Sequence, residues 1–262
     1  MRKFDNPIIN FAAWGYRCVT PIIIVKPMNA VRYFTFFFSD MVRYSFMDQS
    51  KTGMRRPKII DWYPILNEKT SDTSIDAHYF YQAAWAARKI FASKTKEHVD
   101  VGSQVNLIGD LCAFTKVTFI DIRPLQVKIP NLTSKKGSIL AMPYKSNSVS
   151  SLSCLHVAEH IGLGRYGDPL DPQGTKKAAK ELARVLAKGG DLYFSGPVGK
   201  PRVCFNSHRI HSADQILEYF SDLKLVSMSL VEDKNWTFIE NATIAQINSC
   251  SYGCGMFHFT KK

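Results

Sequence analysis

The chain has 262 residues, of which 45% are hydrophobic and 21% charged, and its formal net charge is +12 at pH 7. This composition is typical of a globular protein and excludes collagen-like, low-complexity and small disulfide-stapled chains. Six cysteines are scattered along the chain and only Cys250 and Cys254 lie close together. We therefore predict a reducing, cytoplasmic compartment, no structural metal and no metal-binding residues.

Residues 1–75 are predicted to form a basic, aromatic and partly helical N-terminal extension. Residues 1–58 carry ten Lys/Arg against three Asp/Glu, which favours either an anionic partner or a solvated face. Residues 19–38 are apolar, but Lys26 and Arg32 interrupt them, and Pro21 and Pro27 break helix continuity. We expect this segment to pack on the main domain or to contact a membrane surface peripherally, without spanning it.

The main domain is predicted to cover residues 76–262 and to begin with a helix at 76–93. Asp76 can cap this helix, and apolar side chains at Tyr79, Ala83, Ala86 and Ile90 recur at helical spacing. We expect one domain from this helix to residue 262.

From residue 97 onward, predicted strands alternate with predicted helices. We expect strands at 98–103, 117–122, 137–142, 148–156, 191–197, 224–232 and 255–260, and helices at 105–114, 173–190 and 212–223. Gly189 and Gly190 are expected to end the second of these helices, and Ser212 with Gln215 forms a capping-box pattern at the third. The alternation predicts an α/β, Rossmann-like, doubly wound sheet that is mostly parallel, with an antiparallel last strand.

Ligands of such sheets bind beyond the carboxyl ends of the strands, which directs attention to the residues that follow each strand. Gly102 follows the first strand, where the lack of a side chain lets the backbone approach a ligand. Asp121 ends the next strand, about 20 residues on, where a carboxylate commonly binds ribose hydroxyls. The alternative for Asp121 is that it only caps a turn.

The run "VDVGS…FIDIRP…GSILAMPYKSNSVSSLSCLHVAEHIG…KELARVLAKGGDLYFSGP" resembles the class I S-adenosylmethionine-dependent methyltransferases over about residues 97–260. The segments "HYFYQ", "HVAEHIGLGRYGDPLDPQG", "FNSHRIHS" and "YGCGMFHF" are similar to a methyltransferase-like domain family of unknown function. The resemblance implies S-adenosylmethionine as cofactor and methyl transfer to an oxygen or nitrogen as activity.

The resemblance also implies roles for single residues. Gly102 would face the methionine part of the cofactor, Asp121 the ribose hydroxyls and Met142 the adenine. The full predicted cofactor-binding set is Asp100, Gly102, Ser103, Asp121, Ile122, Ala141, Met142 and His156. Gln104 and Asn106 stand where further glycines are expected, and Ser138 replaces a carboxylate that often binds the adenine amino group. A non-catalytic binding module with a degenerate cofactor site is therefore the alternative.

His156, Glu159 and His160 match the zinc signature H-x-x-E-H, which requires both histidines on one helix. The preceding "SCLH" has the pattern of a strand end, so we expect the segment to lie at the rim of the ligand site instead. Glu159 or His160 could there orient a substrate or accept its proton, or could only brace the loop.

The polar loop 196–212 follows the last parallel strand and supplies the remaining candidates. His208 is a third candidate for acid–base chemistry, and Arg202, Asn206 and Arg209 are predicted to bind a hydroxyl-rich or anionic substrate such as a glycan. The alternative is a solvated loop in which Arg209 anchors a carboxylate. The segment 162–174 is either a lid or an ordered turn. The charge of +12 would also suit an RNA substrate, but no RNA-binding motif supports one.

Overall fold

A computed structural model describes residues 27–47, 53, 57–66 and 68–262 of the chain. The chain divides into two compact units, residues 1–74 and residues 75–262.

The N-terminal unit contains the helix α2 (Pro27–Phe46) and the short 3-10 helix η1 (Ile59–Asp61). Pro27 begins α2 instead of interrupting a helix, because the first turn of a helix needs no N–H from that residue. Leu66 packs against Tyr33, Phe34 and Phe37. Within the described part of the chain, no helix is long and apolar enough to cross a membrane. Residues 19–26 and Pro21 lie outside the described residues, so peripheral membrane contact stays a prediction.

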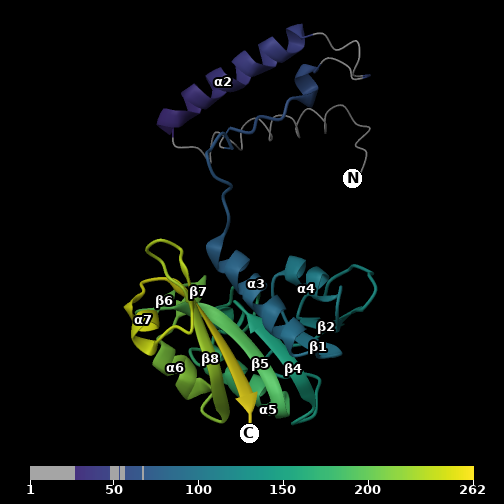
Figure 1. Cartoon of the computed structure of the whole chain (residues 1–262), viewed down its shortest axis with the longest axis vertical. Helices are drawn as coiled ribbons and strands as arrows, with labels where there is room; N and C mark the ends of the chain where they lie inside the picture. The colour runs from purple at the N-terminus through teal and green to yellow at the C-terminus, as the bar shows by residue number, and fades with distance from the viewer. Residues whose placement is uncertain (1–26, 48–52, 54–56, 67) are drawn as a thin grey trace. The chain divides into compact units, whose positions relative to one another are not determined.

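The second unit is built on an eight-stranded sheet of order β3-β2-β1-β4-β5-β10-β8-β9 (Figure 1). Strands β1 to β5 are parallel to one another, whereas β10 runs antiparallel between β5 and β8. The predicted Rossmann-like sheet with an antiparallel last strand is confirmed. The strands span Glu97–Val101 (β1), Lys116–Asp121 (β2), Leu132–Lys136 (β3), Val149–Leu155 (β4), Leu186–Val198 (β5), Leu223–Val231 (β8), Phe238–Glu240 (β9) and Gly253–Lys261 (β10).

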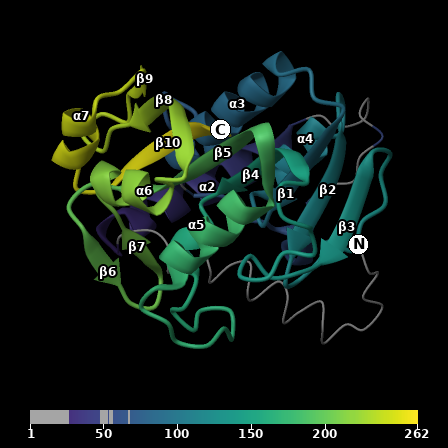
Figure 2. The same cartoon turned by 90° about the horizontal axis from the view of Figure 1, so that it is seen from below.

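Helices cover both faces of this sheet, as Figure 2 shows. The helices α3 (Ala77–Ala92) and α4 (Val105–Leu111) lie on one face, and α5 (Gly174–Val185) and α6 (Ala213–Tyr219) lie on the other. Each face has its own apolar core: Trp85 and Ile108 are fully buried on the first, and Leu182 and Phe220 on the second. The remaining elements are the 3-10 helix η2 (Ala158–His160), the hairpin of β6 (Arg202–Cys204) and β7 (His208–Ile210), and α7 (Ile244–Ser249).

Two predicted elements differ most from the structure. The third strand lies at 132–136, not at 137–142, which forms a turn closed by a bridge between Ser138 and Ala141. This strand has the polar sequence "LTSKK" because it is the edge of the sheet, where lysines are common, so no apolar pattern marks it. The helix predicted at 173–190 ends at Val185, because Leu186 already pairs with Val149 in the sheet.

The capping box predicted for α6 is present and allows a stability test. The Ser212 hydroxyl accepts a hydrogen bond from the backbone N–H of Gln215 (3.2 Å), and the Gln215 side chain accepts one from the N–H of Ser212 (3.1 Å). We expect Ser212→Ala to lower the free energy of unfolding by about 1 kcal/mol, measured by urea denaturation. Ser221→Ala, at an exposed position beyond the helix, should change it much less; equal losses would contradict the capping role.

Candidate functional site

The turn after β1 is hydrogen-bonded to the buried carboxylate of Asp100. Gly102 adopts a positive φ of 67°, and the backbone N–H of Ser103 donates to Oδ1 of Asp100 at 3.0 Å. The hydroxyl of Ser103 in turn accepts from the N–H of Leu155 at 3.1 Å. These bonds tie the glycine turn to the end of β4 and leave its backbone at the surface of a cleft.

Asp100 itself does not face that cleft, contrary to its place in the predicted cofactor-binding set. Its side chain is completely buried and accepts a hydrogen bond from the hydroxyl of Ser153, which also lies 2.8 Å from Nε2 of His98. Burial raises the pKa of Asp100 to about 6 and lowers the pKa of His98 to about 3. The role of Asp100 is therefore to position the turn.

Asp121 lies opposite Gly102, at the end of the neighbouring strand β2. Its Oδ1 accepts a hydrogen bond from the N–H of Arg123 at 2.6 Å. A Cβ placed on Gly102 would come within 3.3 Å of Asp121 Oδ2 and of Val157. A side chain at position 102 would crowd Asp121 and Val157. The glycine therefore lets the Asp121 carboxylate lie directly beside the backbone of the turn.

Two adjoining pockets meet at this pair of residues. One has a volume of about 120 Å³ and is lined by apolar groups that include Ile122, Ile139 and Leu140, together with Ser138 and Tyr166. The other has a volume of about 450 Å³ and includes Ser103, Gln104 and Val105. Both are lined by Gly102, Asp121, His156 and His160. An apolar wall, a carboxylate and exposed turn backbone in one cleft fit the base, ribose and amino-acid parts of the predicted cofactor.

Ala141 and Met142 line neither of these two pockets, contrary to their place in the predicted cofactor-binding set. Met142 is 4% exposed and packs in the core, and its N–H donates to Oε1 of Glu181 at 2.7 Å. The apolar wall comes instead from Ile139 and Leu140. The physical reason is the offset of the third strand: because β3 ends at Lys136, the residues that follow it at the sheet edge come earlier in the chain than expected.

The segment after β4 does not have the helical geometry of an H-x-x-E-H zinc site. His156 has a φ of 56° and precedes η2, which therefore carries Glu159 and His160 but not His156. Glu159 is 2% exposed, and its Oε1 lies 3.0 Å from Nδ1 of His156 and 3.7 Å from Nε2 of His160. Burial acts to raise the pKa of Glu159, but the interactions with His156 outweigh it and lower that pKa.

His160 is oriented by a backbone contact. Its Nδ1 lies 2.6 Å from the carbonyl oxygen of Ser207, which can only accept, so Nδ1 carries a proton. Its Nε2 faces Oε1 of Glu159 at 3.7 Å. His160 lines both of these pockets and a third pocket of about 460 Å³. His208 lines this third pocket as well, with its Nδ1 2.9 Å from the hydroxyl of Ser207.

The third pocket, called the acceptor pocket below, draws its walls from distant parts of the chain. They include Asp76, His78 and Tyr79 from the start of α3, Arg165, Pro197, Trp236 and Tyr252. Apart from His160, Glu159, His156 and His208, none of these lining residues is in the predicted site. In the sequence His78 and Tyr79 belong to "HYFYQ", Arg165 to "HVAEHIGLGRYGDPLDPQG" and Tyr252 to "YGCGMFHF", but nothing in these segments indicates that they meet in one pocket.

The three predicted substrate-binding residues do not line the acceptor pocket. Arg209 is 7% exposed and donates to the carbonyl oxygens of Ile161 (2.5 Å) and Asp171 (2.8 Å). Arg202 donates to the carbonyl oxygens of Lys200 and Ser251, and Asn206 lies in the β6–β7 turn. Both arginines therefore donate hydrogen bonds to backbone carbonyl oxygens of loops. Arg165, and neither Arg202 nor Arg209, lines the pocket. The segment 162–171 is an ordered turn, since Asp168 accepts from the N–H groups of Gly162 and Tyr166.

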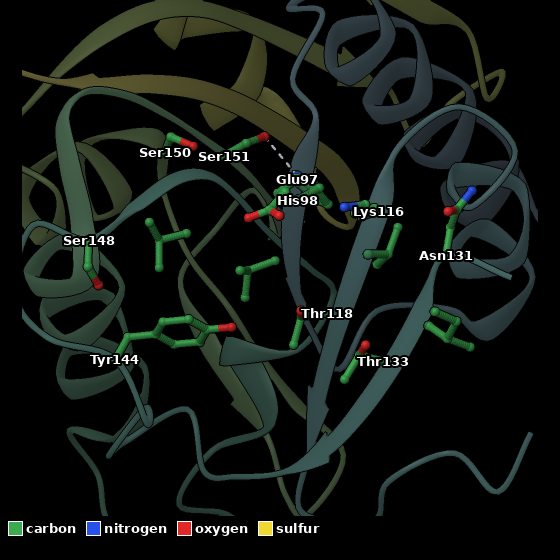
Figure 3. Close-up of a pocket in the computed structure, with 14 residues that line it drawn as sticks. Glu97, His98, Lys116, Thr118, Asn131, Thr133, Tyr144, Ser148, Ser150 and Ser151 are labelled. Atoms are coloured by element: carbon green, nitrogen blue, oxygen red, sulfur yellow. Dashed lines mark hydrogen bonds between the residues drawn. The ribbon is translucent and has the colours of Figure 1, made fainter. Parts of the chain in front are cut away.

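A further pocket, of about 440 Å³, lies at the opposite ends of the strands (Figure 3). It is lined by the first residues of β1, β2 and β4 and by Tyr144, whose hydroxyl points toward Thr118 and hydrogen-bonds to it. Because ligands of parallel sheets bind beyond the carboxyl ends of strands, we place the functional site at the other edge, around Gly102 and Asp121.

Comparisons with known proteins give one family match and several similar folds. Residues 137–248, less than half of the chain, match the family model described as "Caenorhabditis protein of unknown function, DUF268". No curated protein matches the chain.

Solved structures with a similar fold include the [4+2]-cyclase SpnF, with 14% identity and a TM-score of 0.55 over 74% of this chain and 85% of that one. A putative sarcosine dimethylglycine methyltransferase from Galdieria sulphuraria has 14% identity and a TM-score of 0.51 over 70% and 86%. The N-methyltransferase NodS from Bradyrhizobium japonicum has 13% identity and a TM-score of 0.50 over 71% and 98%.

Proposed function

We propose that this chain, which has the class I S-adenosylmethionine-dependent methyltransferase fold, binds S-adenosylmethionine and methylates an oxygen or nitrogen of a small, polar acceptor. The observation that carries the proposal is that two spaces share His156 and His160 as lining residues. One is the cleft beside Gly102 and Asp121, and the other is the acceptor pocket. When bound, the cofactor would supply an electrophilic methyl group.

The residues of the cofactor cleft divide the binding work. Asp121 would accept hydrogen bonds from the two ribose hydroxyls, because it ends β2 with its Oδ2 beside the glycine turn. Ile122, Ile139 and Leu140 would bury the faces of the base. The turn of Gly102 and Ser103 would approach the amino-acid part through its backbone.

The acceptor pocket would orient the second substrate next to a base. His160 donates through Nδ1 to the Ser207 carbonyl oxygen, so its Nε2 can hold the proton that the acceptor loses. His208 lines the same pocket and can bond the acceptor. Because alignment supplies much of the acceleration of a transfer between two bound groups, these residues act chiefly by positioning.

The lining of the acceptor pocket favours a hydroxyl-rich or anionic acceptor, such as a sugar or sugar acid. Arg165 brings a guanidinium to the pocket, and Asp76, Tyr79 and Tyr252 supply further polar atoms. Trp236, which is 47% exposed, offers a ring face on which a flat or cyclic group can pack.

Replacing Asp121 by alanine tests the cofactor site. We expect Asp121→Ala to weaken S-adenosylmethionine binding by about 10- to 100-fold, because hydrogen bonds to a charged group contribute about 1.5–3 kcal/mol. Isothermal titration calorimetry measures this, and Asp110→Ala, an exposed carboxylate on α4, should bind like the wild type. No binding to the wild-type chain at millimolar cofactor would refute the proposal.

Turnover separates the enzyme from the binding module. Release of S-adenosylhomocysteine in the presence of sugars, sugar acids or amines, reduced by His160→Gln, is the expected result. Tight cofactor binding without release for any acceptor class would favour the alternative of a non-catalytic module.

A further inference from the structure

Three side chains from three distant segments meet beneath the acceptor pocket. One ring nitrogen each of His78 and His156 and the sulfur of Cys254 all lie within 4.8 Å of one another, and the three residues are buried. His78 comes from the first turn of α3 and His156 follows β4. Cys254 reaches the same edge because β10 runs antiparallel, so its beginning lies beside Pro197 at the end of β5.

The three atoms are unusual because one has no partner. His78 is 5% exposed and is hydrogen-bonded to the backbone of Tyr252, while its Nε2 is buried without a hydrogen-bonding partner among the described residues. An imidazole nitrogen buried without a partner costs free energy. This lone pair therefore calls for a bound group that the protein itself does not supply.

The geometry points to a zinc site: we propose that His78, His156 and Cys254 bind a divalent ion of the zinc type. Nε2 of His156 lies 3.3 Å from Sγ of Cys254. Tetrahedral zinc, with bonds of about 2.0–2.1 Å to nitrogen and 2.3 Å to sulfur, holds such a pair about 3.6 Å apart. Imidazole and thiolate are ligands that zinc prefers over the magnesium and calcium that bind oxygen.

Glu159 gives this site the surroundings of a metal centre. Histidine ligands of zinc usually donate their second N–H to a carboxylate, which fixes the tautomer and orients the ring. Oε1 of Glu159 lies 3.0 Å from Nδ1 of His156, on the side of the ring away from Cys254. The Glu159 charge is buried, and among the described residues neither of its oxygens forms a well-aligned hydrogen bond, although Oε1 is within ion-pair distance of His156; a cation nearby would offset that charge.

The site also has room for a fourth ligand. His78 and His156 line the acceptor pocket, whereas Cys254 is fully buried beneath them. Zinc sites with three protein ligands keep one position for water or substrate and lower the pKa of what binds there. An ion held by these three residues would face the pocket through that position. The site does not depend on the proposed methyl transfer.

A thiol nucleophile is the rival explanation of the same residues. Cys254, His156 and Glu159 have the order of a nucleophile, a base and an orienting carboxylate. However, Cys254 is 0% exposed and lines none of the four pockets, so a substrate could not reach its sulfur. The nucleophile also leaves the lone pair of His78 unexplained, whereas the metal uses it.

The test is metal binding by the full chain, purified without metal-chelate chromatography and stripped with a chelator. We expect one equivalent of Zn²⁺ to bind, and Co²⁺ in its place to show thiolate-to-cobalt absorption. Cys254→Ser should abolish that absorption and His78→Ala should weaken binding, while Glu159→Gln should weaken it by about 10- to 100-fold. Circular dichroism of each variant separates loss of the site from loss of the fold.

Two control variants make the assignment specific. Cys250→Ser removes another buried cysteine outside the cluster, and His160→Ala tests the H-x-x-E-H pairing of His156 with His160; both should keep wild-type affinity for zinc. The absence of a tight zinc equivalent in the wild-type chain would overturn the proposal. So would binding that survives both Cys254→Ser and His78→Ala, or that is lost with His160→Ala while His78→Ala has no effect.

Discussion

Replacing Gly102 by alanine is expected to weaken S-adenosylmethionine binding by at least about tenfold and to lower the melting temperature. A φ of 67° costs a residue with a side chain about 1–2 kcal/mol. The new Cβ would also lie 3.3 Å from Oδ2 of Asp121 and from Val157, which displaces the carboxylate proposed to bind the ribose. Calorimetry and a thermal melt measure the two effects separately.

Gly109→Ala is the matched control for this substitution. Gly109 lies inside α4 and needs no positive φ, and a Cβ added to it would meet no atom within 4 Å. Alanine there should stabilise the chain by about 0.5–1 kcal/mol and leave cofactor affinity unchanged. If Gly102→Ala bound the cofactor as tightly as Gly109→Ala, the proposal that the cofactor lies against the backbone of the Gly102 turn would be wrong.

The sheet could be predicted from the sequence where periodicity and burial coincide. Strands β1, β2 and β4 are largely buried because they lie inside the sheet with helices on both faces, and their Val, Ile, Leu and Phe residues mark them in the sequence. Strand β3 was not predicted because an edge strand needs no apolar pattern. That error placed Ala141 and Met142 in the predicted cofactor-binding set, whereas Ile139 and Leu140 are the residues of this segment that line the cleft.

The candidate site was predictable only where its residues follow a strand directly. Gly102, Asp121 and His156 end neighbouring strands, and the sheet brings them together whatever the loops do. His78, Tyr252 and Cys254 reach the same place through the helix α3 and the antiparallel strand β10, from positions far apart in the chain. Nothing local in the sequence encodes that meeting. Arg209 was predicted to bind substrate because it is a basic residue on a polar loop. Its guanidinium instead donates hydrogen bonds to backbone carbonyl oxygens.

The buried carboxylate under the glycine turn leads to a second prediction of large effect, on the pH dependence of stability. Asp100 has a pKa of about 6 in the folded chain, raised from 3.8 by burial. A raised carboxyl pKa stabilises the folded chain fully below the unfolded value, and this contribution is lost as the pH rises through 6. The difference of about two pH units corresponds to about 3 kcal/mol. Wild-type stability should lose that amount between pH 4 and pH 8 through this group.

Asp100→Asn should remove the loss while keeping the turn. The Ser153 hydroxyl lies between Asp100 and His98 and can donate to either one. The asparagine amide can donate to Ser153 as a protonated Asp100 would, and its oxygen can still accept from the N–H of Ser103. The free energy of unfolding of Asp100→Asn minus that of the wild type should therefore rise by about 3 kcal/mol from pH 4 to pH 8.

Urea denaturation at several pH values measures this difference, and Asp110→Asn controls for the loss of one exposed charge. Parallel profiles of Asp100→Asn and the wild type would show that Asp100 keeps an ordinary pKa when folded. That result would contradict the raised pKa attributed to burial. Asp100→Ala should behave differently from both, because it leaves the N–H of Ser103 without an acceptor and removes the support of the turn. Its cofactor affinity should fall with that of Gly102→Ala, whereas Asp100→Asn keeps it; the comparison thus separates the charge of Asp100 from its work as a positioning residue.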